Sequence, residues 1–338
     1  MSATALRTLH QLALNETPYP PLESVQAAMA DTFAEVNRYP QFYPDDLMAL
    51  VADWRGVPVE SVLVGSGSVG VALQTLQAYI QHPTDQVLYA WRAFDAYPII
   101  ADMAGAERVE VPLTDSGEQD LAAMAAAVTD RTRVIILCNP HNPTGTVVTR
   151  EALDGFLDAL PADVLVILDE AYTEFARDTD LPNGIDLMRA GRNVLTLRTF
   201  SKAYGLAGLR VGYGIAAPDV VARIRPTAVP YSISRLAHTA VTASVTAEAE
   251  LDARIAVITA ERARVQRELR ELGWNIPDSR ANFVWLDEPV RAEAFHAACA
   301  EHGVQVRLYP GEGIRLTIGT PEANDAVLRA AKSSPSGD

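Results

Sequence analysis

A lysine, two hydroxyl side chains and an arginine lie close together in one short segment that glycines interrupt. These residues are Thr199, Ser201, Lys202 and Arg210. A lysine amine can form a Schiff base with an aldehyde, and hydroxyls and a planar guanidinium suit the oxygens of a phosphate. A Ser-Lys pair alone is a weak signal, because most lysines are solvated surface charges. The interpretation therefore depends on what the rest of the chain supplies.

A carboxylate follows a buried strand that is predicted upstream of this segment. Residues 164–168 are continuously apolar, which is typical of a buried parallel strand, and Asp169 comes directly after them. Open α/β sheets bind ligands at the carboxyl ends of their strands, where a carboxylate can keep a pyridine nitrogen protonated. The alternative is that Asp169 caps a helix. Tyr172 follows, and either reaches the same ring or is an ordinary half-buried tyrosine.

A second predicted strand, residues 134–138, runs into a turn with two prolines and a glycine, residues 139–145. These residue types restrict the backbone, so an amide side chain can be held in one place. Asn142 lies in this turn and can donate to a phenolic oxygen, whereas His141 is expected only to fill a loop position. Pyridoxal phosphate carries a phenolic oxygen, an aldehyde, a pyridine nitrogen and a phosphate, so it matches all of these segments.

In this order, the motifs resemble those of the fold-type I pyridoxal-phosphate aminotransferases. Within that family, the chain is most similar to the histidinol-phosphate aminotransferases and their relatives, the aromatic amino-acid aminotransferases. The resemblance covers nearly the whole chain. It rests on residues 15–19, 37–40, 139–145, 199–210 and 313–319.

The resemblance implies a role for each matching residue around the cofactor ring. Lys202 would form the Schiff base and then move the proton between the substrate Cα and the cofactor C4′. Asp169 would pair with the pyridinium nitrogen, and Asn142 and Tyr172 would hydrogen-bond the ring oxygen. Phe94 would stack on the ring, a purely apolar contact because phenylalanine has no hydroxyl.

The resemblance also implies which groups bind the phosphate. Ser201 and Arg210 would hold it together with the backbone amides of Gly67 and Ser68, and Thr199 is counted among the cofactor-binding residues. The five residues come from two short segments, and the one at residues 65–70 consists mostly of small residues. Small residues let backbone N–H groups and a helix N-terminus approach a phosphate closely.

Four further residues are assigned to the substrate or to a second subunit. Arg315 resembles an arginine that grips the substrate carboxylate, and Arg307 would join it or bind another anionic group; either could instead be a surface ion pair. Tyr19 would contact the substrate side chain. Tyr39 resembles a tyrosine that reaches the phosphate from the neighbouring subunit, which implies a homodimer.

The substrate is less well specified than the cofactor. The segments at residues 67–68, 91–97 and 198–200 resemble the aromatic amino-acid branch more than the histidinol-phosphate branch. We therefore expect amino transfer between phenylalanine, tyrosine or tryptophan and 2-oxoglutarate, with histidinol phosphate as the alternative donor. A pyridoxal-dependent lyase or decarboxylase would share the cofactor residues. A regulatory protein that senses the cofactor would carry a basic DNA-binding extension, which the sequence lacks.

One segment also fits an NAD-dependent dehydrogenase. Residues 65–70 match Gly-x-Gly-x-x-Gly and lie between a short apolar strand and a helical pattern. A dinucleotide site normally has an acidic residue at the end of the following strand. Here that strand, residues 86–90, is followed by Trp91, and the dehydrogenase interpretation leaves Lys202 and Asp169 without a role. We therefore favour pyridoxal phosphate.

The elements that must position these residues alternate between apolar strands and helical patterns, as in residues 69–80 and 150–160. This alternation predicts an α/β fold with a mainly parallel sheet, seven-stranded as the resemblance implies, with flanking helices and a small α+β domain. A long helix is predicted over residues 245–272. The expected divisions are an N-terminal arm with part of the small domain (1–35), a large cofactor domain (36–250), a small C-terminal domain (251–332) and a disordered tail (333–338).

Composition is consistent with a large enzyme that acts on small molecules. The chain has 338 residues and a net charge of −15, which disfavours nucleic acid and anionic membranes as partners. Neither a membrane-spanning apolar stretch nor a signal sequence is evident, so a cytoplasmic location is expected. Cys138 and Cys299 are far apart and are expected to be free thiols. The histidines show no metal-ligand spacing, so no metal is predicted.

Overall fold

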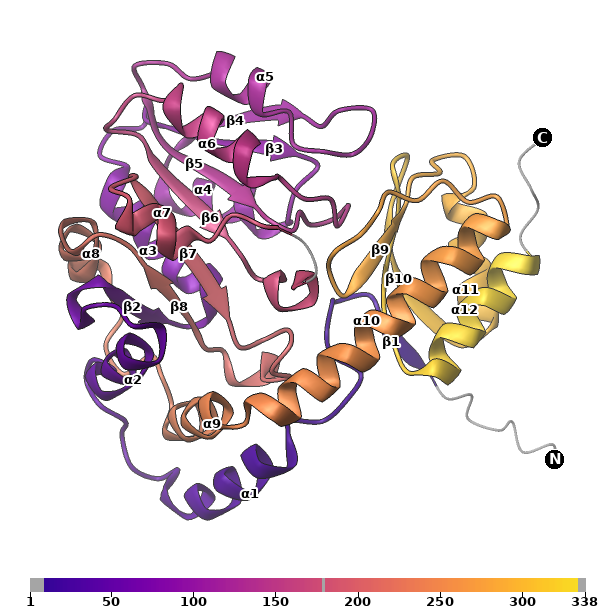
Figure 1. Cartoon of the computed structure of the whole chain (residues 1–338), viewed down its shortest axis with the longest axis horizontal. Coiled ribbons are helices and arrows are strands. Elements are labelled where there is room, and N and C mark those ends of the chain that lie inside the picture. The colour runs from indigo at the N-terminus through magenta and orange to yellow at the C-terminus, as the bar shows by residue number, and fades with distance from the viewer. Residues whose placement is uncertain (1–8, 178–179, 334–338) are drawn as a thin grey trace.

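Two β-sheets organise the chain in the computed structural model, which describes residues 9–177 and 180–333 (Figure 1). The larger sheet has seven strands in the order β2-β8-β7-β6-β5-β3-β4. These are β2 (Val62–Gly65), β3 (Gln86–Trp91), β4 (Glu107–Pro112), β5 (Thr132–Cys138), β6 (Leu165–Asp169), β7 (Val194–Thr199) and β8 (Gly212–Ile215). Only β8 runs antiparallel to its neighbours, so the predicted mainly parallel sheet is confirmed.

The central strands form because they are apolar on both faces. Every residue of β6 is buried, as is nearly all of β5, which suits strands covered by helices on both sides. The sequence pattern did not reveal β4, where charged residues alternate with apolar ones and only Val111 is buried. β4 lies at the edge of the sheet, where exposed charged side chains discourage pairing with another chain.

Helices cover both faces of the larger sheet (Figure 1). They are α2 (Asp45–Arg55), α3 (Gly67–Tyr79), α4 (Ala96–Ala104), α5 (Leu121–Ala126), α6 (Arg150–Asp158), α7 (Gly184–Arg189) and α8 (Pro218–Ile224). α1 (Glu23–Thr32) packs on α9 (Arg235–Thr246) next to this layer. The start of α6 is fixed by Thr149, whose side chain accepts a hydrogen bond from the backbone of Ala152.

The smaller sheet joins the two ends of the chain. Its order is β1-β10-β11-β9, and the N-terminal β1 pairs in parallel with β10. The strands are β1 (His10–Leu12), β9 (Phe283–Leu286), β10 (Val304–Tyr309) and β11 (Gly313–Thr317), packed with α11 (Ala292–Glu301) and α12 (Pro321–Ser333). Ser333 is the last residue of α12, so the tail predicted from 333 was placed one residue too early; residues 334–338 lie outside the described residues.

One long helix connects the two sheets. α10 (Glu248–Glu271) runs from α9 beside the larger sheet to the smaller sheet (Figure 1). The predicted helix over residues 245–272 is therefore confirmed, with a later start. The helix begins late because Ala247, at φ −98° and ψ 34°, is not helical and separates α10 from α9.

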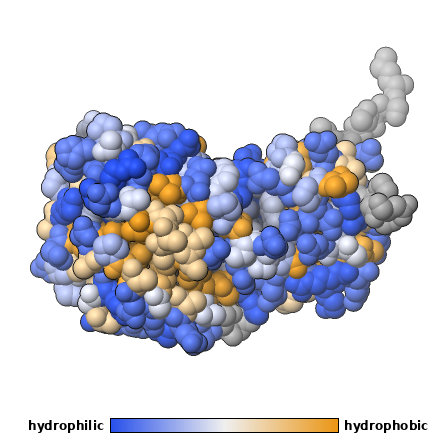
Figure 2. Space-filling model, turned by 90° about the horizontal axis from the view of Figure 1, so that it is seen from above, coloured by the Kyte–Doolittle hydropathy of each residue, from blue (hydrophilic) through white to orange (hydrophobic). Residues whose placement is uncertain are grey.

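The surface seen in Figure 2 is mostly hydrophilic, with a patch of apolar residues on the part built around the larger sheet. Over the described ranges, no helix combines the length and the apolar character needed to cross a membrane. The predicted free thiols are confirmed, since Cys138 and Cys299 are both buried and unpaired with each other.

Candidate active site

A cavity of about 310 Å³ lies at the carboxyl ends of β5, β6 and β7. It brings together nine residues that the sequence predicted for a cofactor site, from segments that are far apart in the chain. They are Ser68, Phe94, Asn142, Asp169, Tyr172, Thr199, Ser201, Lys202 and Arg210. The position agrees with the rule that open α/β sheets bind ligands beyond the carboxyl ends of their strands.

Lys202 presents its amine to this cavity from the loop after β7. Its Nζ donates to the backbone oxygen of Leu14 at 3.3 Å and lies 5.7 Å from the centre of the Tyr172 ring. Burial, together with the positive charge of Arg315, lowers the pKa of Lys202 to about 8. Near physiological pH, a larger fraction of this amine is therefore neutral than in an exposed lysine. The neutral amine is the form that attacks as a nucleophile.

Asp169 is the last residue of β6 and is buried. Its Oδ2 accepts a hydrogen bond from the Tyr97 hydroxyl at 2.8 Å, and its Oδ1 accepts from the Ala171 backbone at 3.2 Å. Burial raises the pKa of Asp169 to about 6, although both hydrogen bonds and Lys202 oppose the shift. The helix-cap alternative is wrong, because a turn follows and the 3-10 helix η3 (Thr173–Ala176) begins after Tyr172.

A hydrogen-bonded group links Asn142 to the smaller sheet. The Tyr172 hydroxyl accepts from Asn142 Nδ2 at 3.4 Å and from Asn15 Nδ2 at 3.2 Å. Arg315 donates from Nη1 to Asn142 Oδ1 and from Nη2 to the backbone oxygen of Ala13, both at 2.7 Å. Arg315 Nε is buried and has no hydrogen-bond partner within the described part of the chain.

The other end of the cavity has the form of an anion cradle. Gly67 and Ser68 begin α3, where free backbone N–H groups and the helix dipole favour negative charge. A Cβ on Gly67 would lie only 2.6 Å from Arg210 Nη2, so glycine leaves space for that guanidinium. Arg210 Nη1 is 3.4 Å from Ser201 Oγ, and Thr199 Oγ1 accepts from the Ser201 backbone at 3.1 Å.

Five predicted residues are not among those that line the cavity. Gly67 adjoins Ser68, and Arg315 contacts Asn142, both of which line it. The other three are Arg307, Tyr39 and Tyr19. Arg307 pairs with Asp95 at 2.9 Å on the surface, which is the alternative given for it above. Tyr39 is 81% exposed. Tyr19 is only partly buried, and the charged groups that act on its hydroxyl belong to Glu261, Glu322 and Arg254.

Several cavity contacts were missed from the sequence. Tyr97 and Asn15 lie in segments that carried the resemblance, but their partners are 72 and 157 residues away along the chain. Tyr97 and Asn15 contact residues that line the cavity, whereas Leu14, Glu16 and Cys138 line it themselves. Phe94 precedes α4, which begins at Ala96, so its spacing from Tyr97 gave no helix-face signal.

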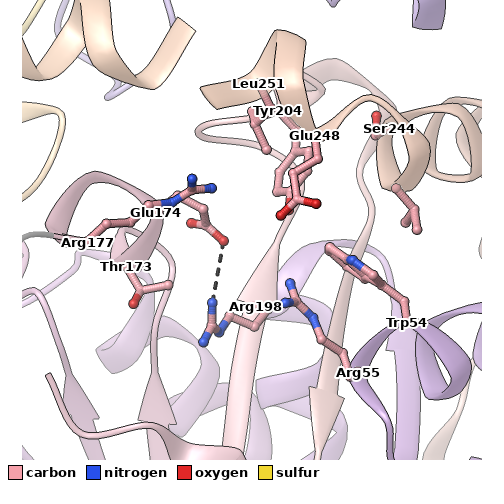
Figure 3. Close-up of a pocket in the computed structure, with 11 residues that line it drawn as sticks. Trp54, Arg55, Thr173, Glu174, Arg177, Arg198, Tyr204, Ser244, Glu248 and Leu251 are labelled. Carbon is pink, nitrogen blue, oxygen red and sulfur yellow. Dashed lines mark hydrogen bonds and ion pairs between the residues drawn. The ribbon is translucent and has the colours of Figure 1, made fainter. Parts of the chain in front are cut away.

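A second cavity of about 200 Å³ shows how the strand ends are fixed (Figure 3). Arg198 points into it and pairs with Glu174 at 3.5 Å and with Glu170 at 2.6 Å. Glu170 directly follows the last residue of β6, Asp169, and Arg198 precedes Thr199 on the neighbouring strand β7. Successive strand residues point to opposite faces, so this buried ion pair ties together the strand ends that present Asp169 and Thr199 to the first cavity.

A family profile described as aminotransferase class I and II matches residues 7–330, nearly the whole chain. The chain belongs to this family. Relatives in the family include an aromatic amino acid aminotransferase of Streptomyces coelicolor, 52% identical over 96% of this chain and 90% of that protein. Another of the same name, from Thermobifida fusca, is 49% identical with the same coverage.

Solved structures agree with this assignment. The histidinol-phosphate aminotransferase of Sinorhizobium meliloti, solved in complex with pyridoxal-5′-phosphate, is 26% identical and has a TM-score of 0.87. The match covers 96% of this chain and 91% of that one. The histidinol-phosphate aminotransferase of Clostridium acetobutylicum, at 20% identity and a TM-score of 0.85 over 96% and 98% of the two chains, shows the shared fold. The resemblance to fold-type I aminotransferases is thereby confirmed.

Proposed function

We propose that this aminotransferase uses pyridoxal phosphate to move an amino group between an aromatic amino acid and 2-oxoglutarate. One observation carries the proposal: a lysine amine, a buried carboxylate and an anion cradle surround a single cavity at the strand ends. The names of the relatives, which are about half identical over almost the full chain, support the aromatic substrate.

The donor set fits pyridoxal phosphate. The cavity of about 310 Å³ lies within the usual size of small-molecule sites, roughly 300–1,000 Å³. The phosphate would be held by Ser68, Ser201 and Arg210, and the glycine at position 67 leaves room for the arginine. The bound cofactor supplies an electron sink that stabilises negative charge at the substrate Cα.

Each residue around the cofactor is assigned a separate role. Lys202 would bind the cofactor aldehyde covalently and, once displaced by the substrate amine, would take the proton from the substrate Cα and deliver it to the cofactor C4′. Asp169 would keep the ring nitrogen protonated. Asn142 and Tyr172 donate to the ring oxygen, and Phe94 covers one face of the ring without adding a polar group.

Arg315 is the group best suited to hold the substrate carboxylate. It is buried, its guanidinium keeps one unpaired donor among the described residues, and it contacts Asn142 directly. A planar guanidinium binds a carboxylate through two parallel hydrogen bonds. Both the amino acid and 2-oxoglutarate carry such a group, so one residue serves both half-reactions.

The ion pairs of the charged residues that flank Phe94 in the chain favour an aromatic substrate over histidinol phosphate. Arg307 pairs with Asp95, and Arg92 donates from Nε to Glu312 at 2.7 Å. A phosphate-bearing substrate would have to displace a carboxylate from one of these arginines. An aromatic side chain needs no such exchange.

We also propose a homodimer in which Tyr39 reaches the phosphate of the neighbouring site. Tyr39 lies in an exposed apolar cluster, where its ring centre is 5.1 Å from that of Tyr231 and the Tyr231 centre is 5.0 Å from that of Phe42. Phe33 and Val36 are exposed nearby in the chain. Such exposed apolar groups commonly mark a protein interface. The free buried thiols support a cytoplasmic location.

A donor panel tests the function. Phenylalanine, tyrosine, tryptophan and histidinol phosphate are each assayed with 2-oxoglutarate, and kcat/KM is compared. We expect the aromatic amino acids to exceed histidinol phosphate by at least about tenfold. A preference for histidinol phosphate would reverse the substrate assignment. Release of ammonia or CO₂ from the donor alone, without amino transfer, would indicate a lyase or decarboxylase.

A further inference from the structure

Tyr97 contacts the carboxylate that is assigned to the cofactor ring nitrogen. Tyr97 is the second residue of α4 and is almost fully buried, at 3% exposure. Its hydroxyl donates to Asp169 Oδ2 at 2.8 Å. The ring is held edge-on to Phe94, with centres 5.6 Å apart at 82°, and edge-on to Tyr89, with centres 6.0 Å apart.

This hydrogen bond and one backbone contact determine how the carboxylate is oriented. Tyr97 occupies Oδ2 and the Ala171 backbone occupies Oδ1, so each oxygen of Asp169 has one donor. Two donors on opposite oxygens fix the plane of a carboxylate, and each oxygen keeps a lone pair for another partner. The carboxylate is therefore already oriented before a ring nitrogen approaches.

The hydrogen bond also favours the charged form of Asp169. The groups that face this carboxylate are Tyr97 from α4, Cys138 from β5, Lys202 from the loop after β7, and Glu170 beside it. Burial raises the pKa of Cys138 and holds the pKa of Tyr97 well above its usual range, so both stay protonated. Tyr97 thus remains a donor throughout the working pH range.

We propose that Tyr97 is a positioning residue, which holds Asp169 ionised and correctly oriented toward the ring nitrogen of the cofactor. The inference rests on the proposed function, because it assumes that Asp169 pairs with that nitrogen. It extends the site from the residues that touch the cofactor to a tyrosine that acts through one of them.

The test compares Tyr97→Phe with Tyr89→Phe in the full-length protein. Tyr97→Phe removes one oxygen and keeps the ring contacts, so the fold is retained. Tyr89 lies in the same aromatic group and its hydroxyl donates to Glu110 at 2.9 Å, so Tyr89→Phe removes a similar bond away from Asp169. The dissociation constant for pyridoxal phosphate and the pH dependence of its binding are measured for each variant.

For Tyr97→Phe we expect the dissociation constant to rise about tenfold to a hundredfold, the range for a hydrogen bond to a charged group. The pH at which binding weakens on acidification should move upward, because an Asp169 without its donor is protonated more easily. Tyr89→Phe should bind like the wild type. Tyr97→His, which keeps a ring donor, should recover part of the affinity, and it provides a second test if Tyr97→Phe proves unstable.

Two further measurements test whether Tyr97 affects cofactor binding through Asp169. A 1-deaza analogue of the cofactor, which lacks the ring nitrogen, should bind equally to the wild type and to Tyr97→Phe. In an Asp169→Asn background, Tyr97→Phe should have little further effect on binding of the cofactor itself. Equal losses with both ligands, or additive losses in the double variant, would overturn the proposal. If the wild type itself does not bind pyridoxal phosphate, the proposed function fails instead.

Discussion

Arg315 donates a 2.7 Å hydrogen bond to the side-chain oxygen of Asn142, so a strand of the smaller sheet is tied to the loop after β5 of the larger one. Both residues are buried. The group proposed for the substrate carboxylate therefore touches the group proposed for the cofactor ring oxygen. A substrate carboxylate held by Arg315 would therefore be aligned with the cofactor ring through this direct contact.

Replacing Arg315 by lysine should weaken the use of carboxylate substrates, because lysine cannot make two parallel hydrogen bonds. We expect kcat/KM for phenylalanine to fall about hundredfold, in line with loss of a buried charge-assisted pair. Phenylethylamine, which lacks the carboxylate, should be processed as slowly by the variant as by the wild type. The matched control is Arg307→Lys on the surface, which should change little. Similar losses for both amines would argue against carboxylate binding.

Asp169→Asn should stabilise the cofactor-free protein while slowing catalysis by orders of magnitude. Burial raises the pKa of Asp169 to about 6, above its ordinary value. The contribution of this side chain to the free energy of unfolding is therefore fully present below its ordinary pKa. It is lost as the pH rises through 6, where the buried carboxyl ionises. Asparagine carries no such penalty and can still accept from Tyr97. At pH 8 we expect a gain of about 1–3 kcal/mol in unfolding free energy, shrinking toward pH 5. Denaturant titrations at both pH values measure it, and a gain independent of pH would contradict the assignment.

Among the ion pairs between the parts of the chain that carry the two sheets, two involve β10 or the turn that follows it. Arg92, after β3, pairs with Glu312 between β10 and β11, and Arg307 of β10 pairs with Asp95. We propose that residues 36–250 and 251–332 are separate domains, which these pairs hold against each other.

Glu312→Gln should therefore raise KM for both substrates by about two- to fivefold, because partly exposed ion pairs contribute little individually. The turnover number should change less than KM. High salt should reduce the difference between the variant and the wild type. An unchanged KM at low salt would show that the pairs do not affect substrate binding.

Mixed dimers test whether Tyr39 crosses a subunit interface. Chains carrying Tyr39→Phe and chains carrying Lys202→Ala are each expected to be impaired alone. A mixed dimer should regain about half of the wild-type activity, because one of its sites combines an intact lysine with an intact partner tyrosine. If Tyr39 acted within its own chain, mixing would restore nothing beyond the activity of the Tyr39→Phe subunit.

Much of the site could be predicted because each residue follows a recognisable local pattern. Asp169 comes directly after an apolar strand, Asn142 lies in a proline-rich turn, and Lys202 is in a glycine-broken loop. The alternation of strands with helices indicated the parallel sheet that places these positions at one edge. Local sequence was sufficient to predict that these residues share a site, because the carboxyl ends of parallel strands lie at the same edge of a sheet.

Contacts between distant segments could not be predicted in this way. The partner of Tyr97 is 72 residues away, and the pairing of Arg307 with Asp95 spans 212 residues. From sequence alone, Arg307 could bind either a substrate anion or a carboxylate of the protein. Only the three-dimensional arrangement shows that it pairs with Asp95. β4 was missed for another reason, because an exposed edge strand rich in charge lacks the apolar run of a buried one.

The central claim is that Lys202 binds pyridoxal phosphate covalently, and the chain allows a direct test because it has two lysines, Lys202 and the exposed Lys332. Protein incubated with pyridoxal phosphate is reduced with borohydride, digested and mapped by mass spectrometry. We predict a cofactor adduct on Lys202 in the wild type and in Lys332→Arg, and loss of the specific adduct with at least about a thousandfold loss of activity in Lys202→Ala. Absence of an adduct, or an adduct confined to Lys332, would contradict the account.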